Sequence, residues 1–169
     1  MANDEQPEKK EDGNRKQIRL ERIHLKDVSL ETPNTPKIFT VDWDPSLAVD
    51  IENHYTFLSD DRYEIVLTVT ATATIADSTA FLIEINQAGI FLLKGYNEQQ
   101  LDRLCNVYCL KQLYPYACST ICELIAKGGF PQLLLAHLNF QQLYEKRLKD
   151  SAADADNPES SDNETANEV

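Results

Sequence analysis

The sequence predicts an α+β domain in which a four-stranded antiparallel β-sheet has helices packed on it. Over residues 63–75 every second side chain is apolar and those between are polar, mostly threonine, with Val66 the exception, and a period of two is typical of a β-strand. Short turn signals separate the apolar runs that follow, up to residue 95, which indicates antiparallel neighbours. Residues 97–149 instead show helix caps and helix-spaced apolar side chains. A run of strands followed by a run of helices favours the α+β class.

The strand at 63–75 is rich in valine, isoleucine and threonine, which suit a pleated surface. Asp77 and Ser78 predict a turn after it. A second strand is expected at 79–87 and a third at 90–94, with Ala88 and Gly89 between them.

An earlier strand is predicted at 18–30, with a β-bulge near Glu21 and Arg22, where the alternation slips by one residue. The four strands in this order predict an antiparallel meander. Residues 32–61 contain three prolines and several aromatic residues, so we interpret them as a long crossing segment. Such long connections are uncommon in compact domains and are often functional.

The C-terminal third is predicted to be helical. Asn97 is a suitable N-cap for a helix at 98–108, and Pro115 suits the first turn of a second helix that runs to Lys127. Gly128 and Gly129 then predict a helix stop. An apolar loop at 130–138 follows, and Asn139 is expected to cap a final helix that ends near Lys149.

The charge is concentrated at the chain ends. We predict a disordered arm at 1–17, one domain at 18–148 and a disordered acidic tail at 149–169. Within the net charge of -12, residues 150–169 have seven acidic residues and no basic one: Asp150, Asp154, Asp156, Glu159, Asp162, Glu164 and Glu168. Such a tail is either solvated or a docking segment for a basic partner surface.

Several classes of function are disfavoured by composition. A nucleic-acid binder needs clustered lysine and arginine, which the mildly acidic domain lacks. There is no signal peptide and no apolar run long enough to span a membrane, so the expected location is the cytoplasm. No glycine-rich phosphate loop is present and the three histidines lie in different elements, so we expect no enzyme and no cofactor.

A metal or disulfide protein is the main alternative, because the four cysteines form two pairs at helical spacing. Cys105 pairs with Cys109 and Cys118 with Cys122, and antiparallel helices could join the pairs into a zinc site. The apolar pattern continues between the pairs, however, and reduced thiols are the default for a cytoplasmic chain. We therefore expect no metal site.

The predicted sheet has more apolar surface than one helix can cover. Phe81, Ile83 and Ile85 share one face of the strand at 79–87, while Leu82 and Glu84 share the other. Uncovered surface of this kind indicates partner subunits or a bound polypeptide. The loop at 130–140 is equally apolar, and it either packs beneath the final helix or forms one wall of a hydrophobic groove.

Six segments, in order, resemble SecB, the family of bacterial protein-export chaperones. They span most of the domain: IHLKDVSLETPNTP at 23–36, YEIVLTVTATA at 63–73, TAFLIEI at 79–85, GIF at 89–91, LYPYA at 113–117 and FPQL at 130–133. The resemblance implies a homotetramer built as a dimer of dimers. It also implies a chaperone that binds unfolded precursor proteins, keeps them competent for translocation and delivers them to the SecA ATPase.

The resemblance also implies site residues. The family's acidic docking surface for SecA corresponds to Asp27, Glu31, Leu82 and Glu84. Its subunit-packing positions correspond to Ile83, Ile85 and Gln87. A client-binding groove would involve Trp43, Phe130, Leu133, Leu135, Phe140 and Tyr144. The sequence departs from the family pattern at Ala88, Leu110, Cys118 and His137, and the last of these leaves the stiffness of the loop open.

Overall fold

The computed structural model describes residues 15–155 of the chain. The strands are β1 (Gln17–Glu31), β2 (Ser46–Phe57), β3 (Arg62–Ile75) and β4 (Ser78–Lys94). A 3-10 turn, η1 (Lys37–Thr40), precedes β2. The helices are α1 (Glu98–Arg103), the π-type segment η2 (Leu104–Cys109), α2 (Leu110–Lys127) and α3 (Phe140–Ala155).

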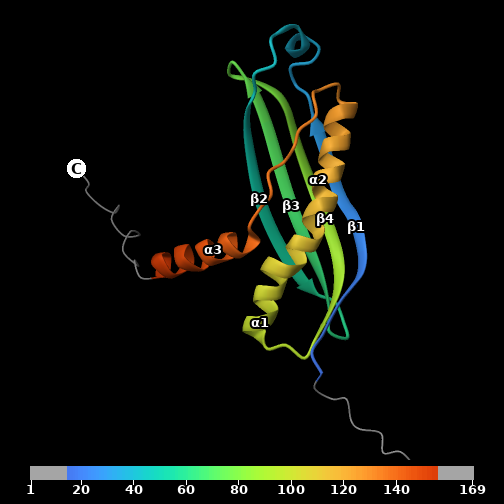
Figure 1. Ribbon diagram of the computed structural model, residues 1–169, viewed down its shortest axis with the longest axis vertical. Helices are drawn as coiled ribbons and strands as arrows, with labels where there is room; N and C mark the ends of the chain where they lie inside the picture. The colour runs from blue at the N-terminus through green and yellow to red at the C-terminus, as the bar shows by residue number, and fades with distance from the viewer. Residues whose placement is uncertain (1–14, 156–169) are drawn as a thin grey trace, which may run out of the picture.

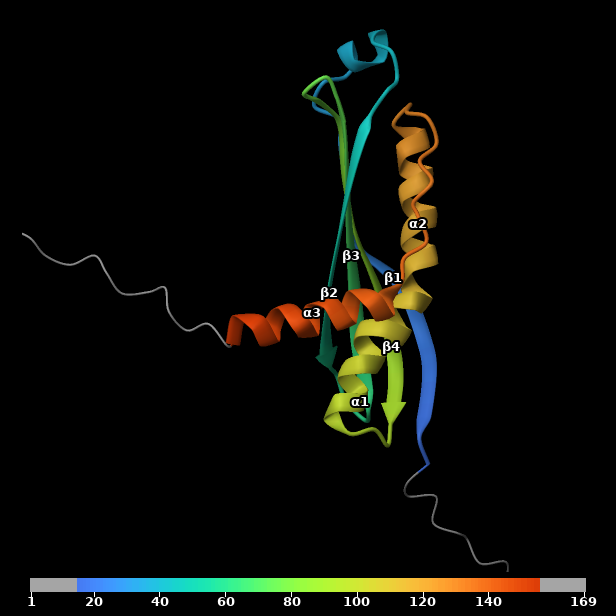
Figure 2. The ribbon, with the colours of Figure 1, turned by 60° about the vertical axis from the view of Figure 1, so that its left-hand side comes forward.

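The strands form one antiparallel sheet in the order β1-β4-β3-β2, and Figure 1 shows α2 lying along it. The predicted fold class is therefore confirmed, but the meander is not its topology. The chain crosses from the β1 edge to the β2 edge before it returns through β3 and β4. Figure 2 shows α2 on one face of the sheet, and no described helix covers the other face.

The two short strands predicted on either side of Ala88 and Gly89 are wrong, because β4 is continuous through both residues. Ala88 and Gly89 are each paired with a residue of β1 and a residue of β3. Gly89 is required for close packing, not for a turn: a Cβ there would lie 2.8 Å from Leu113 Cδ2 and 2.9 Å from Phe91 Cε2. Glycine in a strand often marks such an approach.

The fourth strand is β2, which lies inside the predicted crossing segment at 32–61. The neighbouring prolines and the polar Asn53 conceal a period-two pattern. That pattern consists of Leu47, Val49, Ile51, Tyr55 and Phe57. The β-bulge predicted in β1 is confirmed between Leu20 and Arg22, and the pairing shifts a second time between Leu25 and Asp27.

The predicted break before Pro115 is wrong, because helical structure is continuous from α1 through η2 into α2 and Pro115 lies inside α2. The Asn97 cap is confirmed, with its side chain accepting the Gln100 N–H at 2.9 Å. The helix stop is also confirmed, since Gly129 has φ +84°, a conformation that favours glycine. No helix within residues 15–155 is long and apolar enough to cross a membrane.

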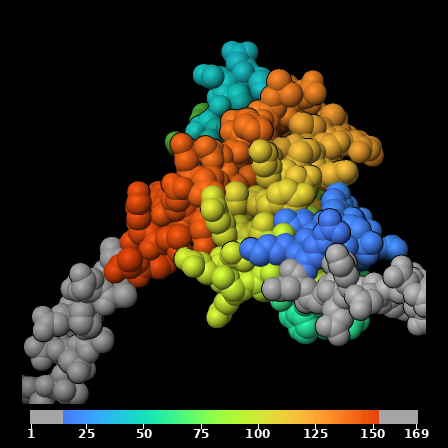
Figure 3. All heavy atoms as spheres, turned by 60° about the horizontal axis from the view of Figure 1, so that its bottom comes forward, coloured from blue at the N-terminus to red at the C-terminus, as the bar shows by residue number. Residues whose placement is uncertain are grey.

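The predicted domain limits of 18–148 fall one residue inside β1 and within α3. β1 begins at Gln17, and α3 continues to Ala155 instead of ending near Lys149. The rest of the predicted N-terminal arm and acidic tail lies outside the described residues, at 1–14 and 156–169. Figure 3 shows α3 standing out from one side of the body, with β1 on the opposite side.

Candidate functional site

The sheet face that α2 leaves open carries the predicted acidic surface. Glu31 on β1 pairs with Leu82 on β4, and Ser29 pairs with Glu84, so these side chains share one face with Asp27. Within the part of the chain that the structure describes, none of the three carboxylates forms a salt bridge. The predicted residues are thus brought together on an open and uncompensated surface.

Two further carboxylates belong to this face and were not predicted. Asp50 on β2 lies across Thr70 from Glu84, and Glu52 lies across Thr68 from Asn86. Both side chains are exposed. The sequence could not place them there because β2 was not predicted, although the alternation around Ile51 was a usable signal. We call the five carboxylates and Leu82 the acidic face: Asp27, Glu31, Asp50, Glu52, Glu84 and Leu82.

At the other end of the same sheet face, the carboxylates are paired with basic side chains. Glu64 accepts a hydrogen bond from Lys26 Nζ at 2.7 Å and lies 3.3 Å from His24 Nε2. The hydrogen bond from Lys26 is the main cause that lowers the pKa of Glu64. Glu21 is similarly bound by Arg62, at 2.8 Å. Unpaired negative charge is therefore concentrated at the Glu31–Leu82 end of the face.

The residues predicted at subunit interfaces do not lie on an accessible surface. Ile83 and Ile85 are fully buried in the core that the sheet forms with α2. Gln87 is 4% exposed, and its Nε2 donates to the His24 carbonyl at 2.8 Å. The two isoleucines alternate toward the helix side of β4, so direct contact with another subunit is not available to them.

An aromatic cluster lies where η1, the segment before β2 and the start of the 130–139 loop meet. The Phe130 ring has its centroid 5.7 Å from that of Trp43, 5.1 Å from Phe39 and 5.2 Å from Phe81. Phe130 is buried, whereas Trp43 is 38% exposed and Phe39 is 50% exposed. Leu133 joins Trp43 in lining a small cavity of 60 Å³. Trp43, Phe130 and Leu133 are therefore brought together, and Phe39 is an addition to the predicted set.

The other predicted groove residues lie elsewhere. Phe140 is buried, with its ring centroid 5.5 Å from that of Tyr114. Tyr144 on α3 donates to Asp102 Oδ2 at 2.7 Å, and Leu135 packs partly buried against the core. The predicted groove is thus divided between an exposed aromatic cluster and a set of contacts that hold the loop and α3 in place.

The 130–139 loop both packs on α2 and forms part of the exposed surface. Tyr114 Oη donates to the Ala136 carbonyl at 2.8 Å, and Cys122 Sγ donates to the Leu133 carbonyl at 2.8 Å. Leu134 projects outward and is 78% exposed. The two alternatives that the sequence left open therefore apply to different residues of the same loop.

All four cysteines are free thiols. Cys105 and Cys109 are completely buried in the core, and burial raises the pKa of Cys105 to about 12. A thiol with this pKa is protonated near neutral pH in the absence of a bound metal. Within residues 15–155 no group of three or more potential metal ligands is found.

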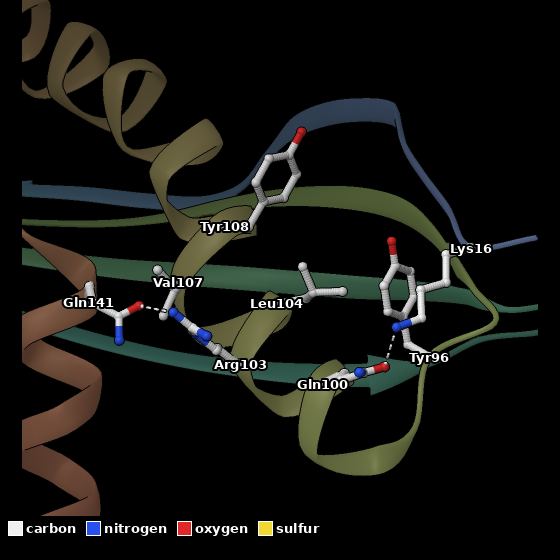
Figure 4. Close-up of a pocket in the computed structure, with 8 residues that line it drawn as sticks. All are labelled: Lys16, Tyr96, Gln100, Arg103, Leu104, Val107, Tyr108 and Gln141. Carbon is white, nitrogen blue, oxygen red and sulfur yellow. Dashed lines mark hydrogen bonds between the residues drawn. The ribbon is translucent and has the colours of Figure 1, made fainter.

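A larger cavity of 360 Å³ opens between the start of β1, α1 and the start of α3. Figure 4 shows Lys16 donating to Gln100 beside the Tyr96 ring, and Arg103 donating to Gln141. None of the predicted site residues lines this cavity.

Comparisons with known proteins agree with this arrangement. The family model described as "Preprotein translocase subunit SecB" matches residues 11–151. A protein-export protein SecB of Alkalilimnicola ehrlichii is 43% identical over 82% of this chain and 73% of its own length. One from Legionella pneumophila is 46% identical over 79% of this chain and 83% of its own length.

Among solved structures, a SecB-like chaperone of Mycobacterium tuberculosis in complex with an antitoxin peptide shares the fold. The TM-score is 0.60 at 15% identity, over 72% of this chain and 88% of the other. The family match covers the sheet, α1, η2, α2, the loop between α2 and α3, and α3 as far as residue 151. This chain belongs to the SecB family of protein-export chaperones.

Proposed function

We propose that this chain acts in the cytoplasm, without catalysis, as the chaperone that holds unfolded precursor proteins for Sec-dependent export. The observation that carries the proposal is uncovered apolar surface on the helix side of the sheet. Leu47 and Val49 on β2 are each 40% exposed, and Leu47 lines a small cavity together with Trp43. Apolar area is worth about 25 cal/mol per Å² when it is buried, so an unfolded segment would gain by covering these side chains.

The names of the relatives support this function. The proteins from Alkalilimnicola ehrlichii and Legionella pneumophila are both protein-export proteins, and the related Mycobacterium tuberculosis chaperone was solved with a bound peptide. Exposed aromatic rings offer large contact area with few rotatable bonds, which suits promiscuous binding. Trp43 and Phe39, held by the buried Phe130, have this character.

Delivery to SecA is assigned to the acidic face. Its carboxylates have no described counter-ion, and a basic segment of the motor would supply one. The acidic face and the aromatic cluster lie on opposite faces of the sheet, because Leu82 and Glu84 alternate with Phe81 along β4. Client and motor could therefore be bound at the same time.

The tetramer is assigned to the β1 edge. β1 is an outer strand of the sheet, and its Leu25 and Val28 are 44% and 37% exposed on the helix side. An exposed edge strand is a template for pairing with a second copy. Ile83, Ile85 and Gln87 would support this interface from inside, since Gln87 holds the β1 carbonyl of His24.

The experiment that tests the function is suppression of aggregation. An unfolded precursor is diluted from denaturant with and without this protein, in the absence of nucleotide, and light scattering is recorded beside the protein's mass in solution. We expect stoichiometric suppression by a tetramer. Unchanged scattering would refute the chaperone function, and a monomeric mass at micromolar concentration would refute the assembly.

A further inference from the structure

The outer edge of β2 presents a row of main-chain groups. Arg147 Nη2 donates to the Ile51 carbonyl at 3.0 Å from outside the sheet, so the main chain of Ile51 points away from β3. Alternate residues of an antiparallel strand point the same way, so the N–H and C=O groups of Leu47, Val49, Tyr55 and Phe57 also face outward. No described strand lies beyond this edge.

The same residues place apolar side chains on the helix side of the sheet. Leu47, Val49, Tyr55 and Phe57 are 40%, 40%, 39% and 58% exposed. Outward main-chain groups combined with period-two apolar side chains form the chemistry that recognises an extended polypeptide. The middle of the strand is different, since Ile51 and Asn53 are only partly exposed.

The Arg147 side chain of α3 reaches that middle. Arg147 donates to the Asn53 side chain as well as to the Ile51 carbonyl. One turn earlier on α3, Tyr144 donates to Asp102 Oδ2 at 2.7 Å. Figures 1 and 2 both show α3 passing β2 and extending beyond the sheet.

Asp102 is the centre of the contacts that fix α3. Its Oδ1 also accepts from Tyr55 Oη on β2 at 3.2 Å and from Asn106 Nδ2 at 3.0 Å. Asn53 in turn donates to Asn106 Oδ1 at 2.9 Å. One carboxylate thus joins β2, η2 and α3, and hydrogen bonds to a charged group are stronger than those between neutral groups.

We propose that Asp102 and Arg147 are specificity-determining residues, which hold α3 across the free edge of β2 and limit the length of extended client that this edge accepts. The proposal rests on the proposed chaperone function. With α3 in place, the edge offers two short stretches, one on each side of Ile51. With α3 released, all 12 residues of β2 become one continuous edge.

The test compares two synthetic peptides with leucine at alternate positions. One has about five residues, the length of one stretch, and the other about eleven, the length of the whole edge. Their affinities are measured for the full chain and for the Asp102→Ala and Arg147→Ala variants. Glu98→Ala on α1 and Lys146→Ala on α3 are matched controls, because both side chains are exposed and make no hydrogen bond or salt bridge within the described residues.

We expect the native chain and both controls to bind the two peptides with similar affinity. Asp102→Ala and Arg147→Ala should bind the longer peptide about tenfold more tightly, as expected for the loss of one or two charge-assisted hydrogen bonds. Alternate amide nitrogens of the longer peptide can be methylated as either of two sets. Methylation of the set that faces β2 should remove the gain in affinity, and methylation of the other set should not. Hydrogen exchange of the β2 amides should be faster in both variants.

Three results would overturn the proposal. Faster exchange without a gain for the longer peptide would show that α3 does not limit the edge. Unchanged exchange and affinity would show that Asp102 and Arg147 do not hold the helix. If the native chain binds neither peptide and fails to suppress aggregation, the proposed function falls together with this inference; if it suppresses aggregation normally, only the inference falls.

Discussion

Replacement of Trp43 by alanine should separate client binding from folding. Trp43 is 38% exposed, and a tryptophan side chain can bury up to about 250 Å², so about 100 Å² remains for a client to cover. At about 25 cal/mol per Å², this area is worth about 2.5 kcal/mol, or roughly a 60-fold change in affinity. The buried remainder packs on Phe130, and its loss should lower the free energy of unfolding by about 3 kcal/mol.

The assay uses the fact that Trp43 is the only tryptophan in the chain. A client without tryptophan should shift the native fluorescence to shorter wavelength as it covers the ring. The affinity of Trp43→Ala is then measured by competition with a labelled client, under conditions in which circular dichroism shows it folded. Tyr116→Ala is the control, because this ring is 52% exposed on α2, away from the aromatic cluster. Equal client affinity for Trp43→Ala and the native chain would refute the assignment of the cluster.

Three other perturbations test separate parts of the structure. Glu31→Lys and Glu84→Lys should weaken binding to SecA by tenfold or more, on the order of 1–2 kcal/mol, and leave client holding unchanged; loss of both activities would contradict the separation of the two faces. Gly89→Ala should lower the free energy of unfolding by about 1–3 kcal/mol in denaturant titration, because its Cβ would overlap Leu113, and an unchanged midpoint would contradict the close packing. Since the hydrogen bond from Lys26 lowers the pKa of Glu64 in the folded state, the pair's contribution to stability is complete above the ordinary pKa near 4.5 and is lost as pH falls through the lower folded-state value. Glu64→Gln should therefore lower the free energy of unfolding at pH 7 and make that free energy less dependent on pH below 4.5. An unaltered acid-unfolding profile would show that the Lys26–Glu64 pair does not stabilise the fold.

The central strand and the fold class were predictable because they depend on local pattern. β3 alternates over most of its length, with Val66 the exception, so its buried face could be predicted residue by residue. The fourth strand was misidentified, because β2 was overlooked and β4 was divided in two at Gly89. Gly89 has the sequence character of a turn, but it is glycine because α2 passes close above it, and that contact depends on a helix distant in sequence.

The candidate site shows the same division. The co-facial arrangement of Leu82 and Glu84 follows from alternation along a single strand. The inclusion of Asp50 and Glu52 depends on the pairing of β2 with β3, which no local pattern gives. Alternation also predicted that Ile83 and Ile85 share a face, but which face α2 covers is a tertiary property. Tyr144 was placed in a client groove by resemblance, whereas its hydroxyl is bound to Asp102.

The most direct test of the function is the refolding rate of an unfolded precursor protein, measured with increasing amounts of this chain and no nucleotide. Refolding should slow and then stop once every client is bound, and the same concentrations of Trp43→Ala should leave most of it uninhibited. A precursor that refolds at the same rate with and without an excess of the native chain would contradict the chaperone assignment.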